Sequence, residues 1–437
     1  MREKPRRSPL DAISCLRGAG TERRQPVPDV FDEVHRRCRD GEPVALATVV
    51  ATWHSAPQPP GAAMVVATDG TVVGSVSGGC VEADLYERAR RVLDTGQPEL
   101  RRYGISDDDA YTVGLTCGGI LDVFVERVDA SSLPALDVVA TARHGGHPAA
   151  IITCVAADAN APPADANAPP ADADDPALDA NAPAVGGGIP SGTGTNDPAR
   201  RLGRRLVLTG QRSVGSLGDD RLDDAAGADA LGLLAAGRSG MLRYGYHGQR
   251  RGAGLSLFVT AYATPPRMIV FGAIDFAAAV ARIGVFLGYR VTVCDARPVF
   301  ATARRFPEAD EVVAQWPHRY LRTELAAGRL DERTVVCVLT HDPKFDVPLL
   351  ELALRHRLAF VGAMGSRRTH DERHKLLSEA GLSRDQLARL ASPIGLDLGG
   401  RTPEETAVSV AAQIVAARWG GTGRPLAALD GPLHRPG

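Results

Sequence analysis

The chain has 437 residues, of which 44% are hydrophobic and 23% charged, which is the composition of a globular protein too long for one ordinary domain. The net charge of −2 and the aromatic content of 5% exclude a general basic or base-stacking surface for nucleic acid. No run approaches the ~20 apolar residues of a membrane span, and the N-terminus lacks the apolar core of a signal peptide. Seven cysteines without a CxxC pair favour neither a disulfide framework nor a zinc knuckle, so we expect a cytoplasmic protein.

Two segments of biased composition divide the chain. The first is basic and rich in Pro and Arg, and the second contains two copies of ADANAPP, so neither can bury a core. The resulting division is a disordered arm at 1–28, an N-terminal domain at 29–155 and 201–264, a disordered insert at 156–200, a second domain at 265–420, and a tail at 421–437.

The N-terminal domain contains a faint internal repeat. EPVALATVV (42–50) is similar to HPAAIITCV (147–155) at an offset of 105, and Arg-Tyr-Gly at 102–104 recurs at 243–245 at an offset of 141. DVFVERV (122–128) is similar to SLFVTAY (256–262) at an offset of 134. The offset rises where the low-complexity insert lies. The pattern predicts one duplicated α+β module with an insertion.

Within the first copy, alternating apolar runs predict strands before and after Thr68-Asp69-Gly70, a hairpin signal. The segment 81–94 has apolar residues at helical spacing and is followed by Gly96, which predicts a helix that stops there. Residues 267–418 differ, because apolar strands alternate with helical patterns. This alternation predicts a doubly wound, Rossmann-like α/β domain with a parallel sheet.

The segment 72–82 carries the sharpest chemical signal. Its Gly-rich turn, Ser77-Gly78-Gly79, joins a strand to a helix that begins near Cys80 and Glu82. Converging amides and a helix N-terminus bind anions and favour a thiolate, which can attack an electrophile, carry sulfur or ligate a soft metal. The alternative is a tight strand–helix turn with a buried cysteine.

A second cysteine lies beside paired glycines in GLTCGG, which comprises Cys117, Gly118 and Gly119. Two cysteines of this kind in one module strengthen the case for a binding site. The remaining five lie in a tail, a helix or apolar strands, and we interpret them as inert thiols. They are Cys15, Cys38, Cys154, Cys294 and Cys337.

The second domain has a defective dinucleotide fingerprint. Gly272 opens the first strand–helix turn, but Ile274 stands where a glycine would admit pyrophosphate, and Asp275 adds negative charge. Asp275 is instead placed to cap the following helix. Asp295 ends the second strand near the position of a ribose-binding acid. We therefore expect a Rossmann-like fold that does not bind NAD(P) in the ordinary way.

A later strand of the same domain ends in small residues followed by two arginines. The residues are Gly365, Ser366, Arg367 and Arg368. Such a group suits a phosphate, and the alternative is a solvated arginine pair at a helix start.

These motifs together resemble the XdhC/CoxI family of xanthine dehydrogenase accessory factors. The resemblance lies in ATVVATWHSAPQPPGAAMVV and DGTVVGSVSGGCVEADL in the first domain, and in FGAIDFAAAVARIGVFLGYRVTVCDARPVFA, VGAMGSRRTHDER and SPIGLDLGGRTPEETAVSVAAQI in the second. It implies a chaperone, not an enzyme, that binds molybdenum cofactor and supports its sulfuration and its insertion into a molybdenum hydroxylase of the xanthine dehydrogenase or CO dehydrogenase type.

Several further expectations follow from the resemblance. Cys80 and its glycines carry over as cofactor contacts, with Cys80 as a candidate molybdenum ligand, and GLTCGG matches less specifically. The further expected cofactor contacts are Ser77 and Glu82 in the first domain, and Gly272, Asp295, Gly365, Ser366, Arg367 and Arg368 in the second. A cysteine desulfurase and a second copy of the chain join the client hydroxylase as expected partners. Gln58 and the GAID turn depart from the family pattern. The alternatives are an NAD(P)-dependent oxidoreductase and a nucleotide-sensing regulator that use the Rossmann-like domain.

Overall fold

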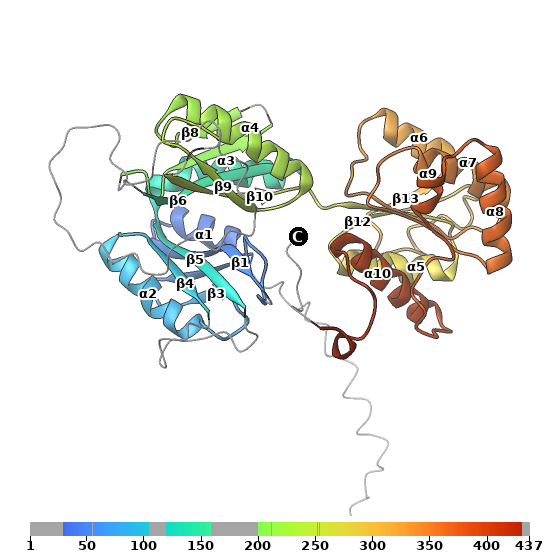
Figure 1. The fold of residues 1–437 in the computed structure, drawn as a ribbon, viewed down its shortest axis with the longest axis horizontal. Helices are drawn as coiled ribbons and strands as arrows, with labels where there is room; N and C mark the ends of the chain where they lie inside the picture. The colour runs from blue at the N-terminus through green and yellow to red at the C-terminus, as the bar shows by residue number, and fades with distance from the viewer. Residues whose placement is uncertain are drawn as a thin grey trace, which may run out of the picture.

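The computed structural model describes residues 29–54, 56–104, 119–158, 200–210, 212–250, 252 and 254–430. The predicted arm and almost all of the predicted insert lie outside these ranges, as do Cys15, Cys117 and Gly118. In Figure 1 the blue-to-green part of the chain forms one lobe and the yellow-to-red part forms another, joined after β10.

The first lobe begins with a five-stranded antiparallel sheet in the order β3-β2-β1-β5-β4. The elements of this unit are α1 (Val30–Arg39), β1 (Val44–Trp53), β2 (Ala63–Ala67), β3 (Val72–Gly74), α2 (Glu82–Thr95), β4 (Glu99–Tyr103) and β5 (Ile120–Val128). The predicted hairpin is confirmed, because β2 and β3 pair around residues 68–70. The helix α2 buries its apolar stripe on the sheet and ends at Gly96, whose φ of 70° only glycine adopts freely.

A second five-stranded sheet follows in the order β8-β7-β6-β10-β9. Its unit contains η3 (Ala130–Ser132), α3 (Leu133–His144), β6 (Ala149–Ala157), β7 (Arg205–Thr209), β8 (Arg212–Gly215), α4 (Asp220–Ala236), β9 (Gly240–Tyr244) and β10 (Leu255–Tyr262). Replacing β1 to β5 by β6 to β10 converts one strand order into the other. The two units therefore share a topology, as the repeat predicts.

The offsets of the sequence repeat agree with the positions of the strands. The strands β1 and β6 begin 105 residues apart, at Val44 and Ala149, and β4 and β9 end 141 residues apart, at Tyr103 and Tyr244. Ala156 and Ala157, the first two residues of the predicted insert, instead belong to strand β6, because they pair with Ser256 and Leu255 of β10.

The second lobe is the Rossmann-like α/β domain expected from the alternating pattern. Its six parallel strands have the order β13-β12-β11-β14-β15-β16, so the order reverses between β11 and β14. The elements are β11 (Arg267–Phe271), α5 (Asp275–Phe286), β12 (Arg290–Asp295), β13 (Glu311–Ala314), α6 (Pro317–Ala326), β14 (Val335–Val338), α7 (Pro343–Leu354), β15 (Phe360–Ala363), α8 (Arg367–Glu379), α9 (Arg384–Ala388), β16 (Leu390–Ala391), α10 (Pro403–Trp419) and η5 (Leu426–Ala428).

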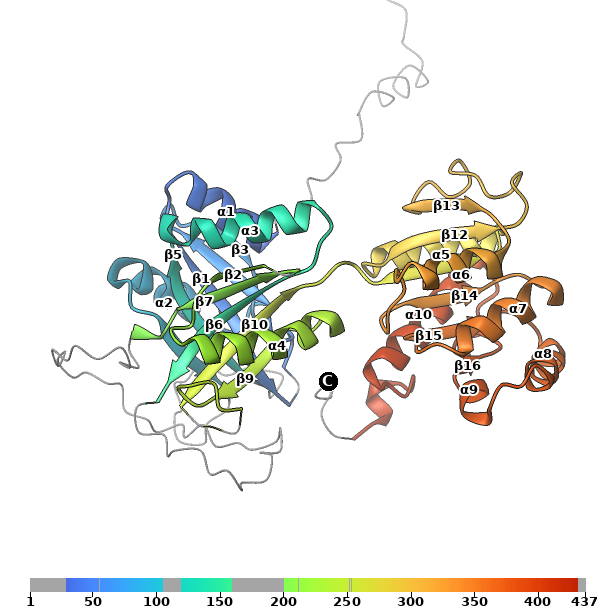
Figure 2. The same cartoon turned by 90° about the horizontal axis from the view of Figure 1, so that it is seen from above.

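Helices cover both faces of this parallel sheet (Figure 2). The helices α5 and α10 complete one apolar core, while α6, α7 and α8 complete the other. Burial on both faces explains why β11 and β14 are apolar at nearly every position. None of the helices in the described ranges is both long and apolar enough to cross a bilayer.

Candidate functional site

The loop between β3 and α2 is built around the carboxylate of Glu82. This carboxylate accepts backbone N–H bonds from Val76 (3.2 Å), Ser77 (2.9 Å), Gly79 (2.9 Å) and Val81 (3.2 Å). It also accepts hydroxyl bonds from Ser75 (2.6 Å) and Ser77 (2.5 Å). The converging amides predicted from the sequence are therefore present, and the anion that they hold is the protein's own side chain.

The hydrogen bonds explain the charge state of Glu82. Burial on its own raises the pKa of this carboxyl, but the bonds from Ser75 and Ser77 outweigh burial and hold the pKa at about 2. The other loop amides are also used, because Gly78 donates to Ser75 Oγ and Cys80 donates to Ser77 Oγ, each at 2.9 Å. A ligand phosphate at this nest has to displace Glu82.

The paired glycines serve the backbone conformation of the loop. Gly78 and Gly79 have φ values of +77° and +120°, which L side chains rarely adopt, while nothing lies within 4 Å of an added Cβ at either position. Gly74 is needed for a different reason, since an added Cβ would lie 2.3 Å from the carbonyl oxygen of Ala63. The loop is thus fixed at its start and open on its outer side.

Cys80 is the half-buried cysteine at the edge of this loop. The other cysteines in the described part of the chain are all buried, as expected of inert thiols. Burial raises the pKa of Cys38 and Cys154 to about 11, and that of Cys294 and Cys337 to about 12. Cys80 directly precedes Val81, the N-cap of α2, and packs against the core under that helix. Its incomplete burial is the feature that distinguishes it from the other described cysteines.

The remaining predicted residues of the first lobe are only partly described. Gly119 is buried immediately before β5, whereas Cys117 and Gly118 lie outside the described ranges. The role predicted for GLTCGG therefore stays a prediction.

In the second lobe, the first strand–helix turn is closed by protein contacts. Gly272 has φ +108°, and an added Cβ would lie 3.0 Å from Thr340. The buried carboxylate of Asp295 accepts a hydrogen bond from the backbone N–H of Ala273 (2.7 Å). It also accepts hydrogen bonds from the backbone N–H and from the guanidinium of Arg297. Burial raises the pKa of Asp295, but these bonds outweigh it and lower the pKa below its usual value. Asp295, the candidate ribose contact, therefore already has hydrogen-bond donors within the protein.

The sequence assigned the wrong role to Asp275. The N-cap of α5 is Ile274, with no side-chain cap bond, and Asp275 instead pairs with Arg305 at 3.3 Å. Capping fails because the side chain lies one residue too far into the helix. Arg305 also donates to the carbonyl of Ala273 at 3.2 Å, so an arginine missed by the sequence reasoning lies beside this turn.

The last predicted group lies at the end of β15, and its two arginines are not buried. Ser366 caps α8 through the N–H of Thr369, and Arg368 is 88% exposed and pairs with Glu372. The buried arginine at this edge is Arg373, which the sequence pattern did not single out. It donates to the carboxylate of Asp346 at 2.8 Å, and burial raises the pKa of that carboxyl.

Each lobe matches a known family model. The model of the XdhC Rossmann domain matches residues 268–414, and the model of the XdhC and CoxI family matches residues 38–104 and 195–245. The chain belongs to the XdhC/CoxI family.

Named relatives agree with this assignment. The chain is 24% identical over 381 residues to a Bacillus subtilis protein named as a probable component of xanthine dehydrogenase, covering 87% of this chain and 94% of the relative. It is 24% identical over 378 residues to the molybdenum cofactor insertion chaperone PaoD of Escherichia coli, covering 86% and 84%. A crystal structure described as a xanthine dehydrogenase from Bacillus halodurans shares the fold, with a TM-score of 0.57 at 22% identity over 91% of this chain and 97% of that one.

Proposed function

We propose that this protein binds molybdenum cofactor as cargo, supports its sulfuration, and delivers it to a molybdenum hydroxylase of the xanthine dehydrogenase or CO dehydrogenase type. The observation that carries the proposal is Cys80 itself, a partly buried cysteine held on a fixed loop of a chain that belongs to this family. The insertion chaperone of Escherichia coli is similar to this chain along most of its length, which supports the same function.

The donor set suits the cargo in part. Molybdenum accepts soft ligands, so a cysteine sulfur at the loop edge is a suitable contact for the metal. The amides beside it are committed to Glu82, so they do not supply the phosphate contact of the pterin. The exposed Arg367 and Arg368 remain the proposed partners for a phosphate, with Gly365 and Ser366 beside them.

The direct test is to co-express the full chain with a molybdenum cofactor pathway and to assay the purified protein. We expect molybdenum by elemental analysis, accompanied by at least one equivalent of pterin by fluorescence after oxidation. Arg367→Ala with Arg368→Ala should reduce the retained cofactor severalfold. A purified protein without molybdenum would contradict the proposal.

The alternative nucleotide functions have a separate test. Because Asp295 is bonded to Arg297 and the turn at Gly272 lies against Thr340, we expect calorimetry with NAD or NADP to show no binding tighter than ~100 μM. Micromolar binding would favour an oxidoreductase or a nucleotide-sensing regulator.

The partners and the compartment belong to the same proposal. A client hydroxylase, a cysteine desulfurase and a second copy of this chain are the proposed partners, and the cytoplasm is the proposed compartment. Co-purification with a tagged hydroxylase tests the client, and sedimentation of the full chain tests the second copy.

A further inference from the structure

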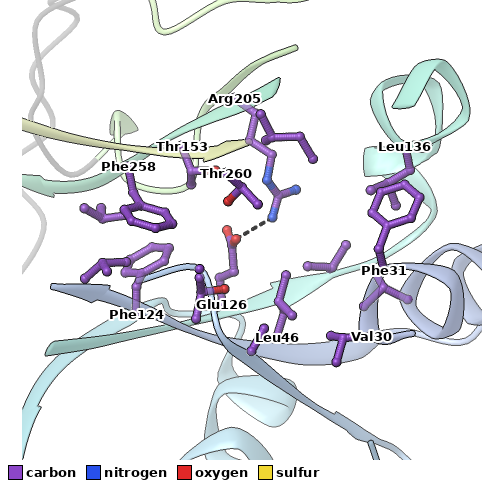
Figure 3. A pocket seen from close by; sticks show the side chains of 18 of the residues that line it. Val30, Phe31, Leu46, Phe124, Glu126, Leu136, Thr153, Arg205, Phe258 and Thr260 are labelled. Carbon is purple, nitrogen blue, oxygen red and sulfur yellow. Dashed lines mark ion pairs between the residues drawn. The ribbon is translucent and has the colours of Figure 1, made fainter. Parts of the chain in front are cut away.

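The two sheets of the first lobe enclose a cavity of about 240 Å³ between their inner faces (Figure 3). Much of its lining comes in equivalent pairs, one from each unit. Thr48 lies opposite Phe124 in the first sheet, and Thr153 lies opposite Phe258 in the second. The pairs Thr48/Thr153 and Phe124/Phe258 therefore occupy matching positions on the two walls.

The equivalence of the walls fails at two charged residues. Ala63 is the β2 partner of Thr48, whereas Arg205 is the β7 partner of Thr153. Leu46 lies opposite Glu126 in the first sheet, and at the corresponding rung of the second sheet Ile151 lies opposite Thr260. Each unit thus contributes one charge where the other unit has an uncharged residue.

The two charges meet across the cavity. Arg205 Nη2 lies 2.7 Å from Glu126 Oε1, and their side chains are only 15% and 9% exposed. Arg205 also donates to Ser132 Oγ at 3.0 Å. Figure 3 shows the pair between Phe124 and Phe258 at one end of the cavity and Phe31 and Leu136 at the other. The lining also includes Asp29, which is exposed.

This arrangement is a poor way to hold two sheets together. Buried charges are costly to desolvate, and apolar residues of similar size often stabilise a core more. Protein interiors also leave few voids larger than a water molecule, because empty volume is destabilising. An ion pair beside unfilled, partly aromatic space is instead typical of a small-molecule site with a few orienting polar groups.

We propose that this cavity binds a small planar heterocycle with a 2-amino-4-oxopyrimidine edge, the edge shared by pterins and guanine. The Glu126 carboxylate accepts two adjacent N–H groups, and Arg205 donates to the neighbouring carbonyl oxygen. Phe124 and Phe258 contact the ring faces. The volume lies just below the ~300–1,000 Å³ of drug-sized pockets, which suits a fused bicyclic ring and excludes a whole nucleotide.

This inference goes beyond the proposed function and does not depend on it. Cys80 packs with the core under α2, on the other face of the first sheet from the cavity, so the two sites are separate. A chain that retains no molybdenum can still bind the heterocycle, and the reverse also holds.

The test is a fluorescence titration of the full chain with pterin. We expect a Kd on the order of 10 μM, competition by 9-methylguanine, and at least about tenfold weaker binding of adenine, which lacks the edge. Glu126→Gln should weaken pterin binding by about tenfold or more, because it removes a charge-assisted acceptor. Whichever of pterin and 9-methylguanine binds with the lower Kd identifies whether the natural ligand is a pterin or a guanine compound.

A second pair of variants keeps the test decisive if Glu126→Gln does not fold. Val155 lines the cavity and clusters with Phe124 and Phe258, so Val155→Phe should fill part of the cavity, keep both charges in the chain and abolish binding. Val408→Phe, the same change on an exposed face of α10, should leave binding unchanged. Thermal melting checks that each variant is folded. The proposal is overturned if neither pterin nor methylguanine binds at ~1 mM, if adenine binds equally well, or if Val155→Phe binds as wild type does.

Discussion

The loops that join the third strand to the following helix differ between the two units of the first lobe, although their frames are the same. Gly74 and Gly215 have φ values of +86° and +88°, and an added Cβ would clash with a carbonyl oxygen at 2.3 Å in one and 2.4 Å in the other. Glu82 and Asp223, 141 residues apart, both accept the N–H of the residue six positions earlier.

The contents of the two loops are different. The first has Ser77, two glycines and Cys80, and every amide from 76 to 81 is bonded within the loop. In the second unit Arg221 occupies the position of Cys80, and Asp219 caps the helix and contacts His247 at 3.0 Å. Both loops therefore share the carboxylate (Glu82 or Asp223) and the glycine at the end of the strand (Gly74 or Gly215), whereas the second loop has no cysteine at the position of Cys80. The proposed chemistry is therefore assigned to the thiol, which the second loop lacks.

The largest expected effect comes from removing the two carboxylates. Glu82→Ala leaves four backbone and two hydroxyl donors without their acceptor, so we expect a loss of about 3 kcal/mol in the free energy of unfolding. Asp223→Ala removes the acceptor of one backbone N–H and should cost about 1 kcal/mol. Urea unfolding measures both. Equal losses would show that the two loops depend on their carboxylates alike.

The same carboxylate should give the protein an acid-sensitive step. The pKa of Glu82 is about 2 in the folded protein against about 4.3 in an unfolded chain, so its stabilising effect is complete above pH ~4.3 and lost as pH falls towards 2. We expect a loss of about 1–2 kcal/mol over this window after allowance for solvent screening. Glu82→Gln should lack this step in urea unfolding between pH 5 and 2.5. An identical pH profile in the variant would remove Glu82 as its source.

The smallest effect is expected from the connection between β6 and β7, which corresponds to the short connection between β1 and β2 in the first unit. Lengthening a loop costs little free energy, so deletion of residues 161–196 should change the melting temperature by less than about 2 °C. The deletion spares Ala157 and also Asp158, whose carbonyl accepts a bond from Tyr246. A loss of several degrees would show that the insert packs on the domain.

The sequence predicts the frame of this molecule better than its polar contacts. Apolar spacing correctly placed α2 and the strands of the parallel sheet. These features depend on local pattern and on burial. The repeat was visible because its offsets of 105 and 141 recur, even though few residues are identical.

The role of Glu82 was missed because amide nests are usually assigned to a ligand. Its position three residues after Gly79, as in a capping box, is the signal that predicts an internal acceptor. The ion pair of Glu126 and Arg205 was also missed, although period-two alternation places Glu126 on the same face as Phe124. Which residue of a distant strand pairs with it depends on how the sheets pack, and local sequence does not encode that.

The most direct test of the account compares Cys80 with its counterpart in the second unit. After co-expression with a molybdenum cofactor pathway, Cys80→Ala should lose most of the molybdenum per protein, while its melting temperature stays within about 2 °C of wild type, since one half-buried sulfur contributes little to the core. Arg221→Ala should retain wild-type occupancy, and Cys117→Ala should lose less than Cys80→Ala. Unchanged molybdenum in Cys80→Ala, or an equal loss in Arg221→Ala, would contradict the assignment of the site to the first loop.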